Sequence, residues 1–141
     1  IMASAVKPGG KVYALEPNPA LSPGLQKLTQ NSGELIEFFQ LAVSDSINSH
    51  NTSIPFFLYP GHSMWSSLSA TVVESPEIIN VQAVSLSDFI HEQKLTKVDF
   101  IKIDVEGVEY KVLRGLSRYL QTAAAKPVIL CEICMGIADI R

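Results

Sequence analysis

The sequence predicts a doubly wound α/β fold, a layer sandwich in which helices cover a mostly parallel β-sheet. Three observations support this prediction. Short apolar segments are rich in β-branched and aromatic residues, amphipathic helical segments lie between them, and residues 98–103 form a nearly all-apolar run. Such a run is typical of a parallel strand that is buried on both faces. The 141 residues suffice for one domain, 1–141, with a sizeable core.

The composition limits the classes of function. Apolar residues make up 47% of the chain and charged residues 18%, as in a globular protein rather than a disordered one. The net charge is −3 and there is no basic cluster, so we expect no nucleic-acid or membrane partner. No apolar run approaches the roughly 18 residues of a membrane span. Because the first residues also lack a signal-peptide pattern, we expect a cytoplasmic protein.

The first part of the chain has the order strand, helix, strand. Residues 11–16 and 35–43 are the predicted strands. The helix between them can begin at Asn18 or at the later Ser22, because a proline follows each of them, and Gly33 would end it. This order predicts parallel pairing with a right-handed crossover.

The middle of the chain departs from this alternation. Residues 53–60 and 78–86 are predicted to be an antiparallel pair of strands, an excursion from the alternation, and a polar loop between them contains His62. A short helix should follow, with Ser85 or Ser87 as its N-cap.

The α/β alternation then resumes with a strand at 98–103, a helix at 107–121 and a strand at 127–133. The helix has an apolar stripe and a polar one. The apolar stripe contains Val108, Val112, Leu113, Leu116 and Leu120, and the polar one contains Glu109, Lys111, Arg114, Ser117 and Arg118.

Cys131 and Cys134 form a C-x-x-C pattern in the apolar segment "VILCEIC" (128–134), which is typical of a buried strand. In a strand, positions three apart point to opposite faces, and no second cysteine or histidine pair would complete a zinc site. We therefore expect two packed, reduced thiols.

Three predicted strands end in an acid, namely Glu16, Asp104 and Glu132. In a parallel sheet these ends lie at one edge, where ligands of α/β folds bind. A simpler interpretation is that Asp104 or Glu106 only caps the next helix or favours its positive N-terminus. Asp104, Glu106 and Glu132 together could also hold a hard cation through their oxygens. Helix capping and ligand contacts explain these acids without a cation, so no metal is predicted.

Glu16 has a more specific interpretation, because an acid after such a strand can accept two hydrogen bonds from a ribose diol. The alternative is a solvated turn residue. The pattern alone fits sites for NAD, FAD and S-adenosylmethionine equally well.

The segments "LEPNP", "LAVSD", "SSL", "VSLSDFI", "VDFIKIDVEGVEYKVLRGL" and "PVILCEI" occur in the order found in FkbM-type methyltransferases, which residues 10–133 therefore resemble. The resemblance implies a Rossmann-like class I fold and S-adenosyl-L-methionine as the cofactor. It also implies O-methylation of a hydroxyl group on a sugar or a natural-product-like small molecule.

The resemblance implies roles for particular residues. Glu16 would bind the ribose, with Asn18 of the same segment in the cofactor site, and Ala42, Val43 and Asp45 would line the adenine pocket. In the same way, Asp104 would face the methyl group and the acceptor.

Methyl transfer to a hydroxyl group calls for a proton acceptor. The candidates are three acids and a histidine: Asp104, Glu106, Glu132 and His62. His62 has the alternative of being an ordinary loop residue. Ser66 and Ser67 match a loop beside the family's active site, and no role is assigned to them.

One feature of the family is missing from this sequence. There is no G-x-G, and Gly9-Gly10 precedes the first predicted strand, so the family's first strand and glycine-rich loop have no counterpart. We therefore expect an internal fragment of a methyltransferase domain, incomplete at its N-terminus and at its C-terminus. Two alternatives stay open: another Rossmann-fold nucleotide enzyme, such as an NAD-dependent dehydrogenase, and a non-catalytic binding module that has lost the cofactor loop.

Overall fold

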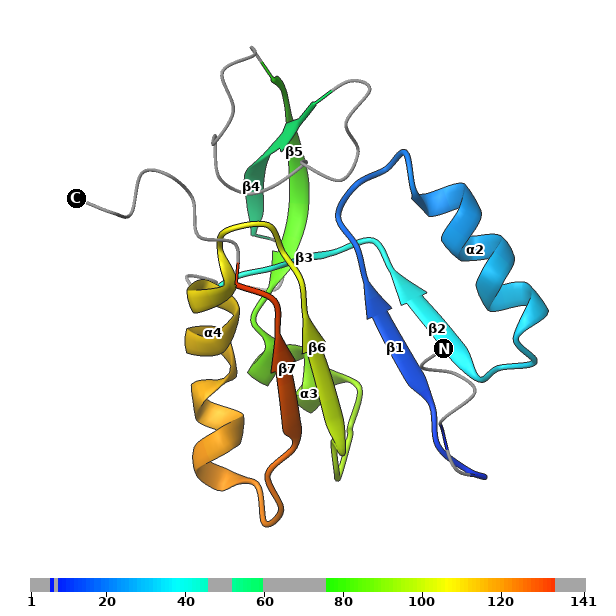
Figure 1. Ribbon diagram of the computed structural model, residues 1–141, viewed down its shortest axis with the longest axis vertical. Helices are drawn as coiled ribbons and strands as arrows, with labels where there is room; N and C mark the ends of the chain where they lie inside the picture. Colours follow the sequence, from blue (N-terminus) through cyan, green and yellow to red (C-terminus); the bar gives the residue numbers. More distant parts are fainter. Residues whose placement is uncertain (1–5, 7, 46–51, 60–75, 134–141) are drawn as a thin grey trace. The chain divides into compact units, whose positions relative to one another are not determined.

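The computed structural model describes residues 6, 8–45, 52–59 and 76–133. Helices and strands alternate in the first and last parts of the described chain, and several strands follow one another in the middle (Figure 1), in agreement with the predicted α/β class. The chain forms two compact units, Ile1–Ala42 and Val43–Arg141, and each is described by itself. The single domain expected from the sequence stays a prediction.

The first unit contains a parallel pair of strands and a helix. Strands β1 (Val12–Leu15) and β2 (Ile36–Phe39) pair in parallel along their whole length, as predicted. Helix α2 (Ser22–Asn31) connects them and packs against β2. The rings of Tyr13 and Phe39 stack with their centroids 6.3 Å apart, which adds aromatic packing between the two strands.

Helix α2 uses the later of its two predicted starts. It begins at Ser22, and Pro23 occupies the first turn, where a helix does not need the missing amide hydrogen. Asn18 therefore lies before the helix and is not its N-cap. Gly33 follows the helix with a φ of 59°, a left-handed conformation that glycine adopts at little cost. The predicted stop is confirmed.

The predicted strand 35–43 is two strands, β2 and the short β3 (Ala42–Val43). The backbone turns between them, because the amide of Leu41 donates to the carbonyl of Phe39 at 3.0 Å. Strand β3 spans the boundary between the two units and is the neighbour of β5 in a three-stranded sheet of order β3-β5-β4.

Strands β4 (Ser53–Leu58) and β5 (Glu77–Val84) form the predicted antiparallel pair. The loop between them, which includes His62, lies outside the described residues. Helix α3 (Leu86–Glu92) follows, and Ser85 is its N-cap, since its Oγ accepts the amide hydrogen of Asp88 at 3.1 Å. This confirms one of the two predicted caps.

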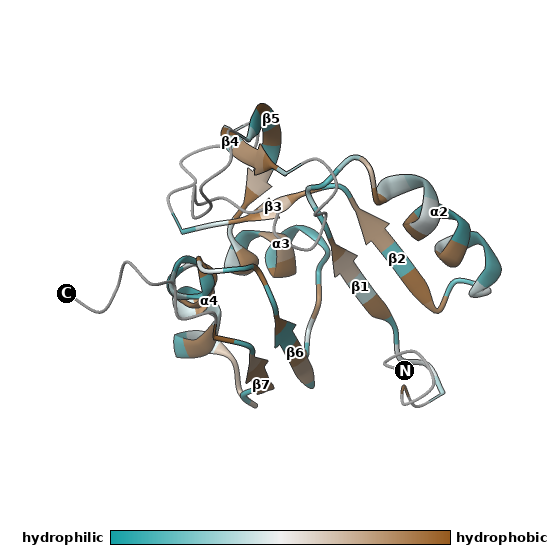
Figure 2. Ribbon diagram, turned by 45° about the horizontal axis from the view of Figure 1, so that its top comes forward, coloured by the Kyte–Doolittle hydropathy of each residue, from teal (hydrophilic) through white to brown (hydrophobic). Residues whose placement is uncertain are grey.

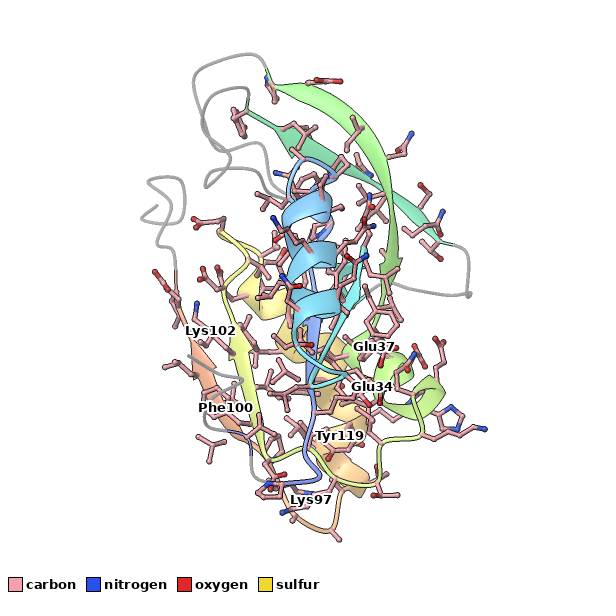
Figure 3. The ribbon with its side chains drawn as sticks, turned by 90° about the vertical axis from the view of Figure 1, so that its right-hand side faces the viewer. Glu34, Glu37, Lys97, Phe100, Lys102 and Tyr119 are labelled. Carbon is pink, nitrogen blue, oxygen red and sulfur yellow. The ribbon has the colours of Figure 1, made fainter. Side chains whose placement is uncertain are left out.

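The second unit also contains a parallel pair, β6 (Phe100–Ile103) and β7 (Val128–Cys131), connected by helix α4 (Glu109–Thr122). The expectation that residues 98–103 are buried on both faces is wrong. Ile103 is buried, but Phe100 is 44% exposed, and Lys102 places a charge on the same exposed face (Figure 3). A continuous apolar run does not determine what covers each face of a strand.

Helices α3 and α4 pack against each other in this unit. Strands β1, β2 and β7 are mainly hydrophobic, whereas α2 and α4 each carry both kinds of side chain (Figure 2). Leu113 of the predicted apolar stripe is 38% exposed. The buried hydrophobic side chains of β6, α3, α4 and the turn before α4 are Ile103, Phe89, Ile90, Val108, Val112 and Leu116.

Candidate functional site

Glu16 directly follows β1 in the first unit, as predicted. Its backbone amide donates to the carbonyl of Phe39 at 3.1 Å, and its Oε1 accepts the amide hydrogen of Asn18 at 2.8 Å. Partial burial raises the pKa of the Glu16 carboxyl above its ordinary value of 4.5, while the hydrogen bond from Asn18 acts in the opposite direction. The site thus holds a partly desolvated carboxylate at the carboxyl end of a parallel strand.

Asn18 is 1% exposed and shapes the turn between β1 and α2. Its Oδ1 accepts the amide hydrogen of Ala20 at 3.0 Å, a local side-chain bond that is common in tight turns. The same turn presents the Asn18 amide to Glu16. The structure therefore gives Asn18 a role in orienting Glu16, and direct contact of its side chain with a cofactor stays a prediction.

Of residues 42–45, which resemble an adenine-binding segment, Ala42 is 1% exposed and Ser44 is 7% exposed. The amide of Ser44 donates to the carbonyl of Val84 at 3.1 Å, which extends the pairing of β3 with β5. The side chain of Asp45 is 10% exposed, and its Oδ2 lies 3.1 Å from Nε of Arg114 in α4. The hydroxyl of Ser44 donates to Asp45 Oδ1 at a distance of 3.5 Å.

Gly115 lets α4 approach this segment closely. A Cβ added to Gly115 would lie 2.6 Å from the carbonyl oxygen of Ser44 and 3.4 Å from Cβ of Ser85. Real Cβ atoms essentially never come as close as the first distance, so this position favours glycine for steric reasons. The backbone of α4 thereby fixes where the Ser44–Asp45 segment lies within the second unit.

Asp104 directly follows β6, and Glu132 directly follows β7. Because the two strands are parallel, both acids lie at one edge, and Lys102 contacts both of them. Its Nζ lies 2.5 Å from Asp104 Oδ2 and 3.9 Å from Glu132 Oε2. The hydrogen bond to Asp104 is the main cause that raises the pKa of Lys102. The predicted convergence of strand-end acids is confirmed for this pair, and Glu16 belongs to the other unit.

The turn between β6 and α4 has two consecutive residues with positive φ, Glu106 at 52° and Gly107 at 100°. Glycine adopts such angles readily, whereas a glutamate does so at a cost of roughly 1–2 kcal/mol. The N-cap of α4 is Val108, without a side-chain capping bond, so neither Asp104 nor Glu106 occupies the capping position. Strained residues cluster at functional sites, which keeps Glu106 a candidate.

The prediction that Glu109 lies on the polar stripe of α4 is wrong. Its position in the helical pattern assigned it to the polar stripe, but it is 7% exposed. Its Oε1 accepts the amide hydrogen of Gly107 at 2.8 Å, so the carboxylate holds the preceding turn. The signal available in the sequence was an acid in the first turn of a helix, two residues after a glycine.

Cys131 ends β7 as a half-buried, free thiol. Burial is the main cause that raises its pKa above 9.0, and the negative charge of Glu109 acts in the same direction. A raised pKa means little thiolate at neutral pH, in agreement with a packed thiol. Four residues of the sequence-based predictions lie outside the described ranges: the candidate proton acceptor His62, the loop residues Ser66 and Ser67, and the second cysteine, Cys134.

The described residues contain no group of three or more His, Cys, Asp or Glu side chains that could hold a metal ion. They also contain no helix with the length and apolar character needed to cross a membrane.

A family model for the Methyltransferase FkbM domain matches residues 1–140. No curated protein and no solved structure matches the chain significantly.

Proposed function

The chain belongs to the FkbM methyltransferase family, and we propose that it transfers a methyl group from S-adenosyl-L-methionine to a hydroxyl group of a small molecule. The acceptor class that we propose is a sugar or a natural-product-like molecule. The Rossmann-like layer sandwich belongs to the same proposal, supported by the parallel pairs β1–β2 and β6–β7. The cytoplasmic location predicted from the sequence is also part of it.

The observation that carries the cofactor assignment is the environment of Glu16. This carboxylate follows a parallel strand and is partly buried, and Oε1 is held by a backbone amide. An ionised carboxylate accepts up to about four hydrogen bonds, so it can also receive both hydroxyl hydrogens of a ribose diol. The residues present therefore fit the ribose of the proposed cofactor.

We assign contact with the adenine to the segment that contains β3 and the two residues after it. Ala42 and Val43 would provide apolar contact for the adenine ring, and the Asp45 carboxylate would accept a hydrogen bond from its amino group. The low exposure of Ala42 and of the Asp45 side chain supports this assignment, because hydrogen bonds to a desolvated carboxylate discriminate strongly between ligands.

When bound, S-adenosylmethionine supplies a methyl group on a positively charged sulfur. The residues of this chain would orient the acceptor oxygen, exclude water and take up its proton. Asp104 is the acid that we assign to this task, because it ends β6 and is accessible enough to meet an acceptor.

Lys102 affects how Asp104 can act. The ammonium group is bonded to Oδ2 at 2.5 Å, so we assign the other oxygen, Oδ1, to the acceptor hydroxyl. Glu106 stands two residues further along the strained turn and is the alternative proton acceptor. His62, the third candidate, lies outside the described residues.

The binding of S-adenosylhomocysteine to the full-length natural protein tests this proposal. Glu16→Ala should weaken binding by about 10- to 150-fold, because hydrogen bonds to a charged group contribute about 1.5–3 kcal/mol. The matched control is Glu37→Ala, which removes a carboxylate of the same unit that pairs with Lys11 at 2.5 Å (Figure 3). Isothermal titration calorimetry gives both dissociation constants.

The control variant Glu37→Ala shows whether binding depends on Glu16 in particular or on the loss of any carboxylate from the first unit. We expect Glu37→Ala to bind S-adenosylhomocysteine as the wild type does. Equal affinities for the wild type and Glu16→Ala would remove Glu16 from the ribose site. A wild-type protein that does not bind the ligand would refute the proposed function itself.

A further inference from the structure

We propose that Arg114 is a positioning residue for the nucleotide base: it holds the Asp45 carboxylate where that group accepts a hydrogen bond from the adenine amino group. This inference rests on the proposed function and extends it to a residue on α4. It begins with the short contact between Arg114 Nε and Asp45 Oδ2, which are 3.1 Å apart.

The two partners differ in their exposure. The side chain of Asp45 is 10% exposed, whereas that of Arg114 is 70% exposed. A carboxylate removed from water is unfavourable unless a charge or hydrogen-bond donors compensate it. Arg114 supplies that positive charge at Oδ2, and the hydroxyl of Ser44 donates to Oδ1 at 3.5 Å. Because an ionised carboxylate accepts up to about four hydrogen bonds, a carboxylate held in this way can still accept a hydrogen bond from a ligand.

The backbone of Arg114 is held in place by its neighbours. Gly115 brings α4 against the carbonyl of Ser44, the residue before Asp45. Further along the helix, Ser87 Oγ of α3 accepts the amide hydrogen of Tyr119 at 3.1 Å. A fixed helix and a planar guanidinium restrict the carboxylate more than a flexible ammonium would.

The chemistry of the base makes this restriction useful. Adenine presents an amino group as a donor, and an ionised carboxylate only accepts. Hypoxanthine has a carbonyl oxygen at the same position, which a correctly placed carboxylate repels. A carboxylate held by Arg114 should therefore favour adenine over hypoxanthine, whereas an unrestrained one can turn away from the oxygen.

The test compares S-adenosylhomocysteine with S-inosylhomocysteine, in which hypoxanthine replaces adenine. Dissociation constants for both are measured by calorimetry on the full-length wild type, Arg114→Met and Arg114→Lys. Arg118→Met is the matched control, because Arg118 lies on the same helix, is 64% exposed and pairs with Asp88 rather than Asp45.

We expect the ratio of the two dissociation constants to fall by roughly tenfold in Arg114→Met, the size of one lost charge-assisted contact. Arg114→Lys should give an intermediate ratio, and Arg118→Met the wild-type ratio. In an Asp45→Asn background, Arg114→Met should have no further effect on the ratio, because the two residues act as one pair.

A role for Arg114 in stability alone would weaken the binding of both ligands equally and leave the ratio unchanged, and this result would overturn the proposal. So would an equal fall of the ratio in Arg118→Met. If the wild type binds neither ligand, the proposed function is refuted, and the role of Arg114 is refuted with it. These outcomes are distinguishable because the last one concerns the wild type.

Discussion

Replacing Gly115 by alanine tests how α4 positions the Ser44–Asp45 segment. In an ordinary helix interior this change stabilises a protein by about 1 kcal/mol, because alanine loses less backbone entropy on folding. At Gly115 the new Cβ would lie 2.6 Å from the carbonyl oxygen of Ser44 and 3.3 Å from its carbonyl carbon. Both atoms are backbone, so the helix or the β3 segment must shift.

The expected size follows from these two opposing effects. Overpacking of this kind costs about 1–3 kcal/mol, which cancels or exceeds the gain in helix propensity. The control is Gly24→Ala in α2, where nothing lies within 4 Å of the added Cβ. Gly115→Ala should therefore be less stable than Gly24→Ala by about 1–3 kcal/mol, a difference of roughly 3–10 °C in Tm.

Urea unfolding and thermal melting of the two variants and the wild type measure this difference. Gly24→Ala should equal or exceed the wild type in stability, and Gly115→Ala should fall below Gly24→Ala. If Gly115→Ala stabilises the protein as much as Gly24→Ala does, the close approach of α4 to Ser44 is wrong.

Three further predictions concern the candidate site. Asp104→Asn should lower kcat strongly while the affinity for S-adenosylhomocysteine stays within about twofold of the wild type, since the acid is assigned to the acceptor; an unchanged kcat would reduce Asp104 to a structural residue. Burial raises the pKa of the Glu16 carboxyl above 4.5, so the folded chain binds the carboxyl proton more tightly than the unfolded chain does. The free energy of unfolding therefore falls as the pH rises from 4.5 through the raised pKa of the folded state. Glu16→Gln should accordingly raise the Tm at neutral pH and lose this advantage below pH 4.5, and an advantage that does not vary with pH would contradict the assignment. Glu106→Gly should be more stable than Glu106→Ala by about 1 kcal/mol, because both variants lose the same side-chain contacts and only glycine relieves the left-handed conformation; equal free energies of unfolding in urea would contradict the positive φ of this residue.

Local patterns predicted the strands well. Segments such as β1 and β4 combine apolar, β-branched and aromatic residues with turn residues at their ends, so their position follows from the sequence alone. The start of α2 was ambiguous because Asn18 and Ser22 are both followed by proline; the helix begins at Ser22, whose hydroxyl donates to Gln40 Oε1 at 3.0 Å, a contact that no local pattern indicates. The acids that end β1, β6 and β7 were placed correctly for the same local reason.

Local sequence patterns did not predict the contacts between residues that lie far apart in the sequence. The pairing of Asp45 with Arg114 depends on how α4 packs on the chain after β3, and no periodicity signals it. The close approach at Gly115 is invisible for the same reason, because a helical glycine alone predicts only weaker helix formation. Glu109 was misplaced because the helical period assigns a face but does not show that Gly107 presents an amide to that carboxylate.

The most direct test of the central claim is a calorimetric titration of the full-length natural protein with S-adenosylhomocysteine and, separately, with NAD. The two ligands share an adenine and a ribose, so they distinguish a methyltransferase from another enzyme that uses an acid such as Glu16 for ribose binding. We predict saturable binding of S-adenosylhomocysteine and much weaker binding of NAD. Tight binding of NAD without binding of S-adenosylhomocysteine, or binding of neither, would contradict the account.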